Sequence, residues 1–145
     1  MAFKHNKTGR SLGERFVKLT WFMLESAAWR SLTPSARAVY IELVRVYNGR
    51  NNGFIGLSVR CAAERCRINK DTAAKAFKQL QETGFIECVT PGGFSRKVPH
   101  ATEWRLTAEL CNKTGAVGTK DFMRWQQASG RETNQRSQLS SGTVP

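Results

Sequence analysis

The apolar residues in the first half of the chain recur at helical spacing after a capping signal. Thr33-Pro34 combines an N-cap hydroxyl with proline at the first helical position. The apolar residues that follow lie three or four positions apart and are Ala36, Tyr40, Leu43, Val44 and Tyr47. This pattern predicts a helix over residues 34–48, ended by Asn48-Gly49.

Two further helices are predicted in the middle of the chain. Ser58 is placed to cap a helix from Val59 to about Cys66, and Asn69 to cap one from Lys70 to Thr83, with Gly84 after its end. Helical geometry gathers the apolar residues of the second helix on one face, which we expect to be buried: Ala73, Ala76, Phe77 and Leu80. The residues on the opposite face are Asp71, Lys75, Lys78 and Glu82.

Short apolar runs predict strands over residues 54–56, 85–90 and 101–107. Residues 91–100 join the last two strands and contain Pro91-Gly92-Gly93 followed by basic residues, so this part reads as a hairpin with a long basic tip. We expect the buried residues of this region to be Phe85, Ile86, Trp104 and Leu106, together with Cys66.

The two ends of the chain differ from the middle. Residues 1–15 read as a flexible basic arm, and residues 111–145 as a mostly disordered tail with a short apolar motif at 120–125, which leaves a domain over 16–110. Residues 16–32 carry enough apolar area for a short helix or packed segment. Its aromatic residues Trp21, Phe22 and Trp29 either pack against the helix over 34–48, which we favour, or form a dimer interface.

Composition then narrows the function. The chain has 145 residues, enough for one domain and a tail, and its 23 Lys and Arg against 11 Asp and Glu give a net charge of +12. Such an excess indicates a polyanionic partner. Without a membrane-spanning apolar run or a secretory signal, we expect a cytoplasmic protein whose four cysteines are reduced thiols.

Enzymatic and metal chemistry are disfavoured. Only two His and two Asp are available for acid–base or metal chemistry, and Cys61 and Cys66 lie five residues apart, about 140° around a helix, which is not a zinc knuckle. Pro91-Gly92-Gly93 lacks the helix and Lys-Ser/Thr of a phosphate loop. The sequence therefore predicts no enzyme, no metal and no cofactor, and no residue marks a ligand pocket.

The order strand, helix, turn, helix, strand, basic loop, strand between Phe54 and Thr107 resembles the winged helix-turn-helix DNA-binding family. Residues 57–64 resemble the support helix, 68–80 the recognition helix and 82–86 the exit into the wing. The likeness is to GntR- and MarR-type regulators and to the winged-helix modules of phage and plasmid replication proteins. It implies an α+β, mainly α fold with an extra N-terminal helical segment.

The resemblance implies a sequence-specific binder of double-stranded DNA, either a transcription regulator or a replication-origin module of a phage- or plasmid-like element, with the recognition helix in the major groove. The residues expected at DNA are Asn69, Lys70, Asp71, Thr72, Lys75 and Lys78 on that helix, Arg60 and Arg67 beside the turn, and Arg96, Lys97 and His100 in the wing, on the backbone or minor groove. In the alternative interpretation, Asn69 only caps the helix, Asp71 pairs with Lys75, and the lysines are solvated.

Three further expectations stay open. The family often has glycine where this chain has Arg67, so the turn either carries a backbone cost of roughly 1 kcal/mol or adopts another geometry. A homodimer is expected by analogy, since such regulators commonly read two half-sites. The second function hypothesis is an adaptor that recruits replication or transcription machinery through Phe122, Met123 and Trp125 in its tail.

Overall fold

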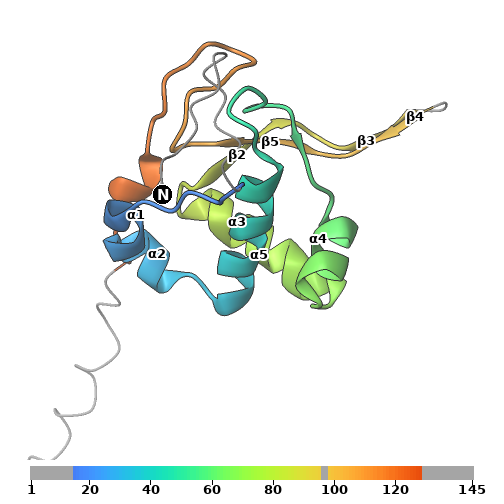
Figure 1. Cartoon of the computed structure of the whole chain (residues 1–145). Coiled ribbons are helices and arrows are strands. Elements are labelled where there is room, and N and C mark those ends of the chain that lie inside the picture. Colours follow the sequence, from blue (N-terminus) through green and yellow to red (C-terminus); the bar gives the residue numbers. More distant parts are fainter. Residues whose placement is uncertain (1–14, 96–97, 129–145) are drawn as a thin grey trace, which may run out of the picture.

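The computed structural model describes residues 15–95 and 98–128 (Figure 1). This part of the chain is a small α+β domain with five α-helices, a three-stranded antiparallel sheet and a two-stranded hairpin. The predicted basic arm, apart from Arg15, and residues 129–145 of the predicted tail lie outside the described residues.

The elements follow one another in nearly the predicted order. They are α1 (Trp21–Glu25), α2 (Ala27–Ser31), α3 (Pro34–Val46), β1 (Ile55–Gly56), α4 (Val59–Cys66), α5 (Lys70–Glu82), β2 (Ile86–Thr90), β3 (Gly93–Ser95), β4 (Val98–His100), β5 (Glu103–Leu106) and the short 3-10 helix η1 (Asp121–Met123).

The capping residues act as predicted from the sequence. The side-chain oxygens of Thr33, Ser58 and Asn69 accept hydrogen bonds from the backbone N–H groups three residues later, at the starts of α3, α4 and α5. Each bond satisfies one of the N–H groups that a helix leaves free at its first turn, which typically stabilises the helix by about 1 kcal/mol. Gly84, with φ +84°, follows the end of α5 as expected.

The three-stranded sheet has the order β1-β5-β2, so the last strand lies in the middle. Trp104 in β5 is the register partner of Ile55 in β1 and of Cys88 in β2. Its indole N–H donates a hydrogen bond to the Leu57 carbonyl at 3.0 Å. The register shifts between Cys88 and Thr90, and the chain then continues into the β3–β4 hairpin, which projects from the body in Figure 1. Much of the predicted loop over 91–100 is therefore paired strand.

The aromatic segment before α3 is divided between core and surface. It forms the two short helices α1 and α2, and Trp29 packs edge-on against Tyr40 and Phe85 with ring centroids 5.7 Å apart in both cases. The favoured packing against α3 is thus confirmed for Trp29. Trp21, by contrast, is 75% exposed and takes no part in the core.

The expectation of a mostly disordered tail from residue 111 is wrong for the part that the structure describes. Cys111 is buried, and Phe122 in η1 is only 1% exposed, stacked on Phe85 with ring centroids 4.7 Å apart. Phe22 covers the segment at a centroid distance of 6.3 Å to Phe122. The physical reason is that Phe85 and Phe22 form an apolar surface that Phe122 covers.

Asn52, just before β1, is fully buried and joins the tail to the sheet. Its amide N–H groups donate to the carbonyls of Leu106, Glu109 and Leu110 at 2.9–3.2 Å, and its side-chain oxygen accepts from the Leu106 N–H at 2.6 Å. A buried amide with all these bonds holds the chain leaving β5 in one place.

The prediction that Cys66 is buried is also wrong, because its side chain is only partly covered, at the end of α4. Partial burial, followed in effect by the nearby Glu42 carboxylate, raises the pKa of the Cys66 thiol. None of the described residues gather into a group of three metal-ligating side chains, and no described helix is long and apolar enough to cross a membrane.

Candidate nucleic-acid interface

The buried apolar residues of α5 determine which of its side chains are exposed. Ala73, Ala76, Phe77 and Leu80 are buried as predicted, and Phe77 stacks on Trp104 with ring centroids 4.9 Å apart. Burying a large apolar side chain contributes roughly 1.5–3 kcal/mol, so this face fixes the rotation of the helix about its axis. The exposed residues that result are Lys70, Asp71, Ala74, Lys75 and Lys78, whereas Thr72 is half-buried.

The cap of α5 uses one of the predicted DNA-binding residues. The side-chain oxygen of Asn69 accepts from the Thr72 N–H at 2.7 Å, so this oxygen is already engaged in the helix. The capping role that the alternative interpretation gave Asn69 is therefore real. It leaves the side-chain amide N–H groups as the part of Asn69 available to a partner.

The lysines of α5 differ in their surroundings. Lys78 pairs with Glu82 at 3.9 Å, an exposed contact of the kind that contributes about 0.3–0.5 kcal/mol. The Asp71–Lys75 pair of the alternative interpretation is not among the ion pairs of residues 15–95 and 98–128. Within that part of the chain, Lys70 and Lys75 likewise have no carboxylate partner, so their charges face solvent.

The turn between α4 and α5 places Arg67 in the left-handed region, with φ 54° and ψ 44°. The backbone N–H of Arg67 donates to the Glu64 carbonyl at 3.3 Å, and that of Ile68 to the Ala63 carbonyl at 3.0 Å, which closes the end of α4. Of the two outcomes left open, the chain thus keeps the glycine-type turn and bears its backbone cost. The Arg67 side chain is exposed beside the start of α5.

Arg60 lies on the exposed side of α4 and pairs with Glu64 at 3.3 Å. Both side chains are largely exposed, so the pair is weak and a phosphate could replace the carboxylate. Arg60 therefore adds positive charge near the turn without being tied into the fold.

The hairpin is only partly described. Arg96 and Lys97 lie outside the described residues. His100 pairs with Gly93 at the end of the hairpin nearest the main sheet, and its Nε2 lies 3.1 Å from the Pro91 carbonyl. The placement of His100 at the hairpin tip was therefore wrong, because strand pairing continues through 98–100 and brings its ring back to the base.

Gln79 holds the start of α3 against α5, a role that the sequence analysis missed. Its side-chain oxygen accepts from the N–H and the hydroxyl of Thr33 at 3.2 and 3.1 Å, and its amide donates to the Ser31 carbonyl at 3.2 Å. A shallow groove of about 420 Å³ runs beside this contact, lined among others by Thr72, Lys75 and Gln79. The partners lie 46 and 48 residues away in sequence, so no local signal marks Gln79.

The tail motif does not present all the side chains expected for a partner. Phe122 is a core residue, whereas Met123 is half exposed and Trp125 is partly buried against the core. A partner binding here would reach Met123 and part of Trp125 but not Phe122.

Comparisons with protein-family models, with curated proteins and with solved structures give no match.

Proposed function

We propose that the chain is a winged helix-turn-helix protein that binds double-stranded DNA in a sequence-specific way, with α4 and α5 as the helix pair and β3–β4 as the wing. The order and pairing of the elements are compatible with this fold. The role would be that of a transcription regulator or of a replication-origin binding module, without an enzymatic activity.

One observation carries the proposal. The apolar face of α5 is locked into the core, while Lys70 and Lys75 on its other side are exposed and have no carboxylate partner among the described residues. A rigid helix with free ammonium groups and a small residue, Ala74, between them suits the major groove, where lysine donates to guanine. The net charge of +12 adds attraction to phosphates.

Other cations would contact the backbone. Arg67 lies in the turn just before α5 and Arg60 lies on the exposed side of α4, and the hairpin leaves the body at the end of the molecule where α4 lies in Figure 1. In this proposal the arginines and the hairpin contact phosphates and fix the position of α5 along the duplex. Only α5 contacts base edges. Arg96 and Lys97 belong to the same proposal from the sequence alone.

The test is enrichment of duplexes from a random pool at about 150 mM salt and again at higher salt, followed by affinity measurements on the enriched site. Lys70→Gln and Lys75→Gln should each weaken binding to that site about tenfold or more, with a smaller loss on an unrelated duplex. Lys120→Gln removes the same charge far from α5 in sequence and serves as the matched control.

An enriched motif with two-fold symmetry, together with light scattering of the complex, would reveal the expected homodimer. If no motif survives the higher salt, or if Lys75→Gln binds the enriched site as tightly as the unchanged protein, α5 is not the reading element and the proposal fails.

A further inference from the structure

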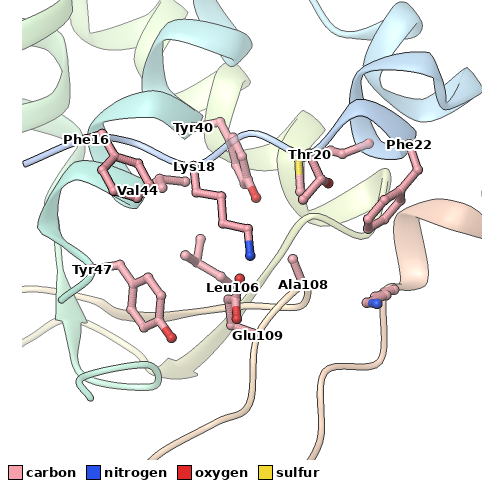
Figure 2. Close-up of a pocket in the computed structure, with 12 residues that line it drawn as sticks. Phe16, Lys18, Thr20, Phe22, Tyr40, Val44, Tyr47, Leu106, Ala108 and Glu109 are labelled. Atoms are coloured by element: carbon pink, nitrogen blue, oxygen red, sulfur yellow. The ribbon is translucent and has the colours of Figure 1, made fainter. Parts of the chain in front are cut away.

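A second hollow lies apart from α5, between the N-terminal segment, α3 and the chain that follows β5. Figure 2 shows this pocket, whose volume is about 360 Å³. That volume falls at the lower end of the range of about 300–1,000 Å³ typical of small-molecule sites. Its apolar wall includes Phe22, Val44 and Leu106.

Tyr40 contributes a phenol hydroxyl to the pocket. Tyr40 is 1% exposed and packs its ring against Trp29 and Phe85. Its hydroxyl points into the pocket in Figure 2, and no hydrogen bond between described residues uses it. The hydroxyl is therefore accessible from the pocket, and a ligand that accepts from it would form a hydrogen bond that no described residue provides.

Thr20 provides a second, independent observation. It occupies the N-cap position of α1, yet its side chain makes no capping hydrogen bond. Its hydroxyl is buried, lines the same pocket, and is without a hydrogen-bond partner among the described residues. The wall of the pocket thus contains one buried hydroxyl without a partner among the described residues, that of Thr20, beside the Tyr40 hydroxyl that points into the pocket, and such polar groups favour a site that a bound molecule completes.

The charged residues that line the pocket indicate the chemical class of its ligand. Figure 2 shows the ammonium of Lys18 directed into the middle of the pocket. Lys120 also lines the pocket, and its ammonium lies 5.2 Å from the centroid of the Phe22 ring. Burial, followed in effect by the Glu109 carboxylate, raises the pKa of Tyr40 and of Tyr47 above the ordinary value. Both phenols, which are protonated at neutral pH even at that ordinary value, are hydrogen-bond donors there. The pocket thus offers mainly donors and positive charge.

Among the described residues that line the pocket, Glu109 is the one with a carboxylate. It would repel a second negative charge, so a dianion such as phosphate fits less well than a monoanion. We propose that this pocket binds a small organic monoanion, a carboxylate on an apolar body, with the carboxylate at Lys18 and Tyr40 and the apolar body against Phe22, Val44 and Leu106. This inference does not depend on DNA binding.

The test is a titration of the full chain with benzoate and hexanoate, followed by amide chemical shifts in NMR. Both carboxylates should bind at millimolar concentration or below and shift residues 18–23 and 106–109, whereas benzamide and benzylamine should bind at least about tenfold more weakly. Tyr40→Phe keeps the aromatic packing and removes only the hydroxyl, so it should fold and lose about tenfold in benzoate affinity.

Lys18→Met should cause a similar loss, and Lys70→Met removes the same charge elsewhere and serves as its control. The inference is overturned if neither carboxylate shifts these residues, if benzamide binds as well as benzoate, or if Lys70→Met weakens benzoate as much as Lys18→Met. None of these outcomes bears on the duplex measurements above, so the two proposals stand or fall separately.

Discussion

Replacing Arg67 by glycine tests whether the turn between α4 and α5 carries a backbone cost. Arg67 has φ 54° and ψ 44°, a conformation that costs an L-residue about 1–2 kcal/mol relative to glycine. Part of this gain in stability, roughly 0.5–1 kcal/mol, is lost because glycine makes the unfolded chain more flexible. Arg67→Gly should therefore stabilise the domain by about 0.5–1 kcal/mol, and Arg67→Ala, which keeps the backbone cost, should not.

Urea unfolding followed by tryptophan fluorescence, together with calorimetry, measures this difference. For a domain of this size the gain corresponds to an increase in Tm of about 2–4 °C. Arg60→Gly is the control, because it introduces glycine inside α4 and should lose about 1 kcal/mol. If Arg67→Gly is no more stable than Arg67→Ala, the argument from backbone strain is refuted.

Three other predictions concern the segments that close the core. Phe122→Ala removes a buried ring from between Phe85 and Phe22 and should lose about 3–4 kcal/mol of unfolding free energy in urea, whereas a loss below about 1 kcal/mol would contradict the packing of the tail. Asn52→Leu keeps the volume but leaves the buried Leu106 N–H and three carbonyls without their partner, so a loss of at least about 3 kcal/mol is expected, and near-neutral stability would argue against this network. Hydrogen bonds from Lys113 and then Thr90 lower the pKa of Glu103, so the stabilisation from this contact is complete above the unfolded-state pKa and is lost as the pH falls through the lowered folded-state value. Lys113→Met should return the pKa of Glu103 toward its ordinary value in an NMR titration, and an unchanged titration would show that Lys113 is not the cause.

The parts of the fold that sequence reasoning predicted correctly are those determined by neighbouring residues. A cap at Asn69 and the spacing of Ala73, Ala76 and Phe77 fix both the start of α5 and the face it buries. The side chains that α5 exposes follow from the same geometry, since a helix with one buried face has only one face left. For this reason the exposed and buried faces of α5 could be predicted almost completely.

The features that were missed depend on residues far apart in the chain. Gln79 contacts Thr33 across 46 residues of sequence, and Asn52 binds the Leu106 carbonyl at the end of β5 across 54. Phe122 gave one local signal, because a large apolar residue in a polar segment needs a surface to cover. That surface is made by Phe85 and Phe22, and no periodicity in residues 111–125 points to it.

Arg67 connects the stability argument with the proposed function. Glycine would fit the turn at lower cost, and the fold itself gives nothing back for the arginine, since its side chain is exposed and forms no ion pair with the described residues. Residues that are unfavourable for the local backbone conformation occur most often at functional sites, where binding of a partner offsets their cost in stability. At Arg67, a contact with a DNA phosphate beside the start of α5 would offset the backbone cost. Arg67→Gly and Arg67→Ala should therefore differ in stability but weaken duplex binding equally, each reducing the salt dependence by about one phosphate contact.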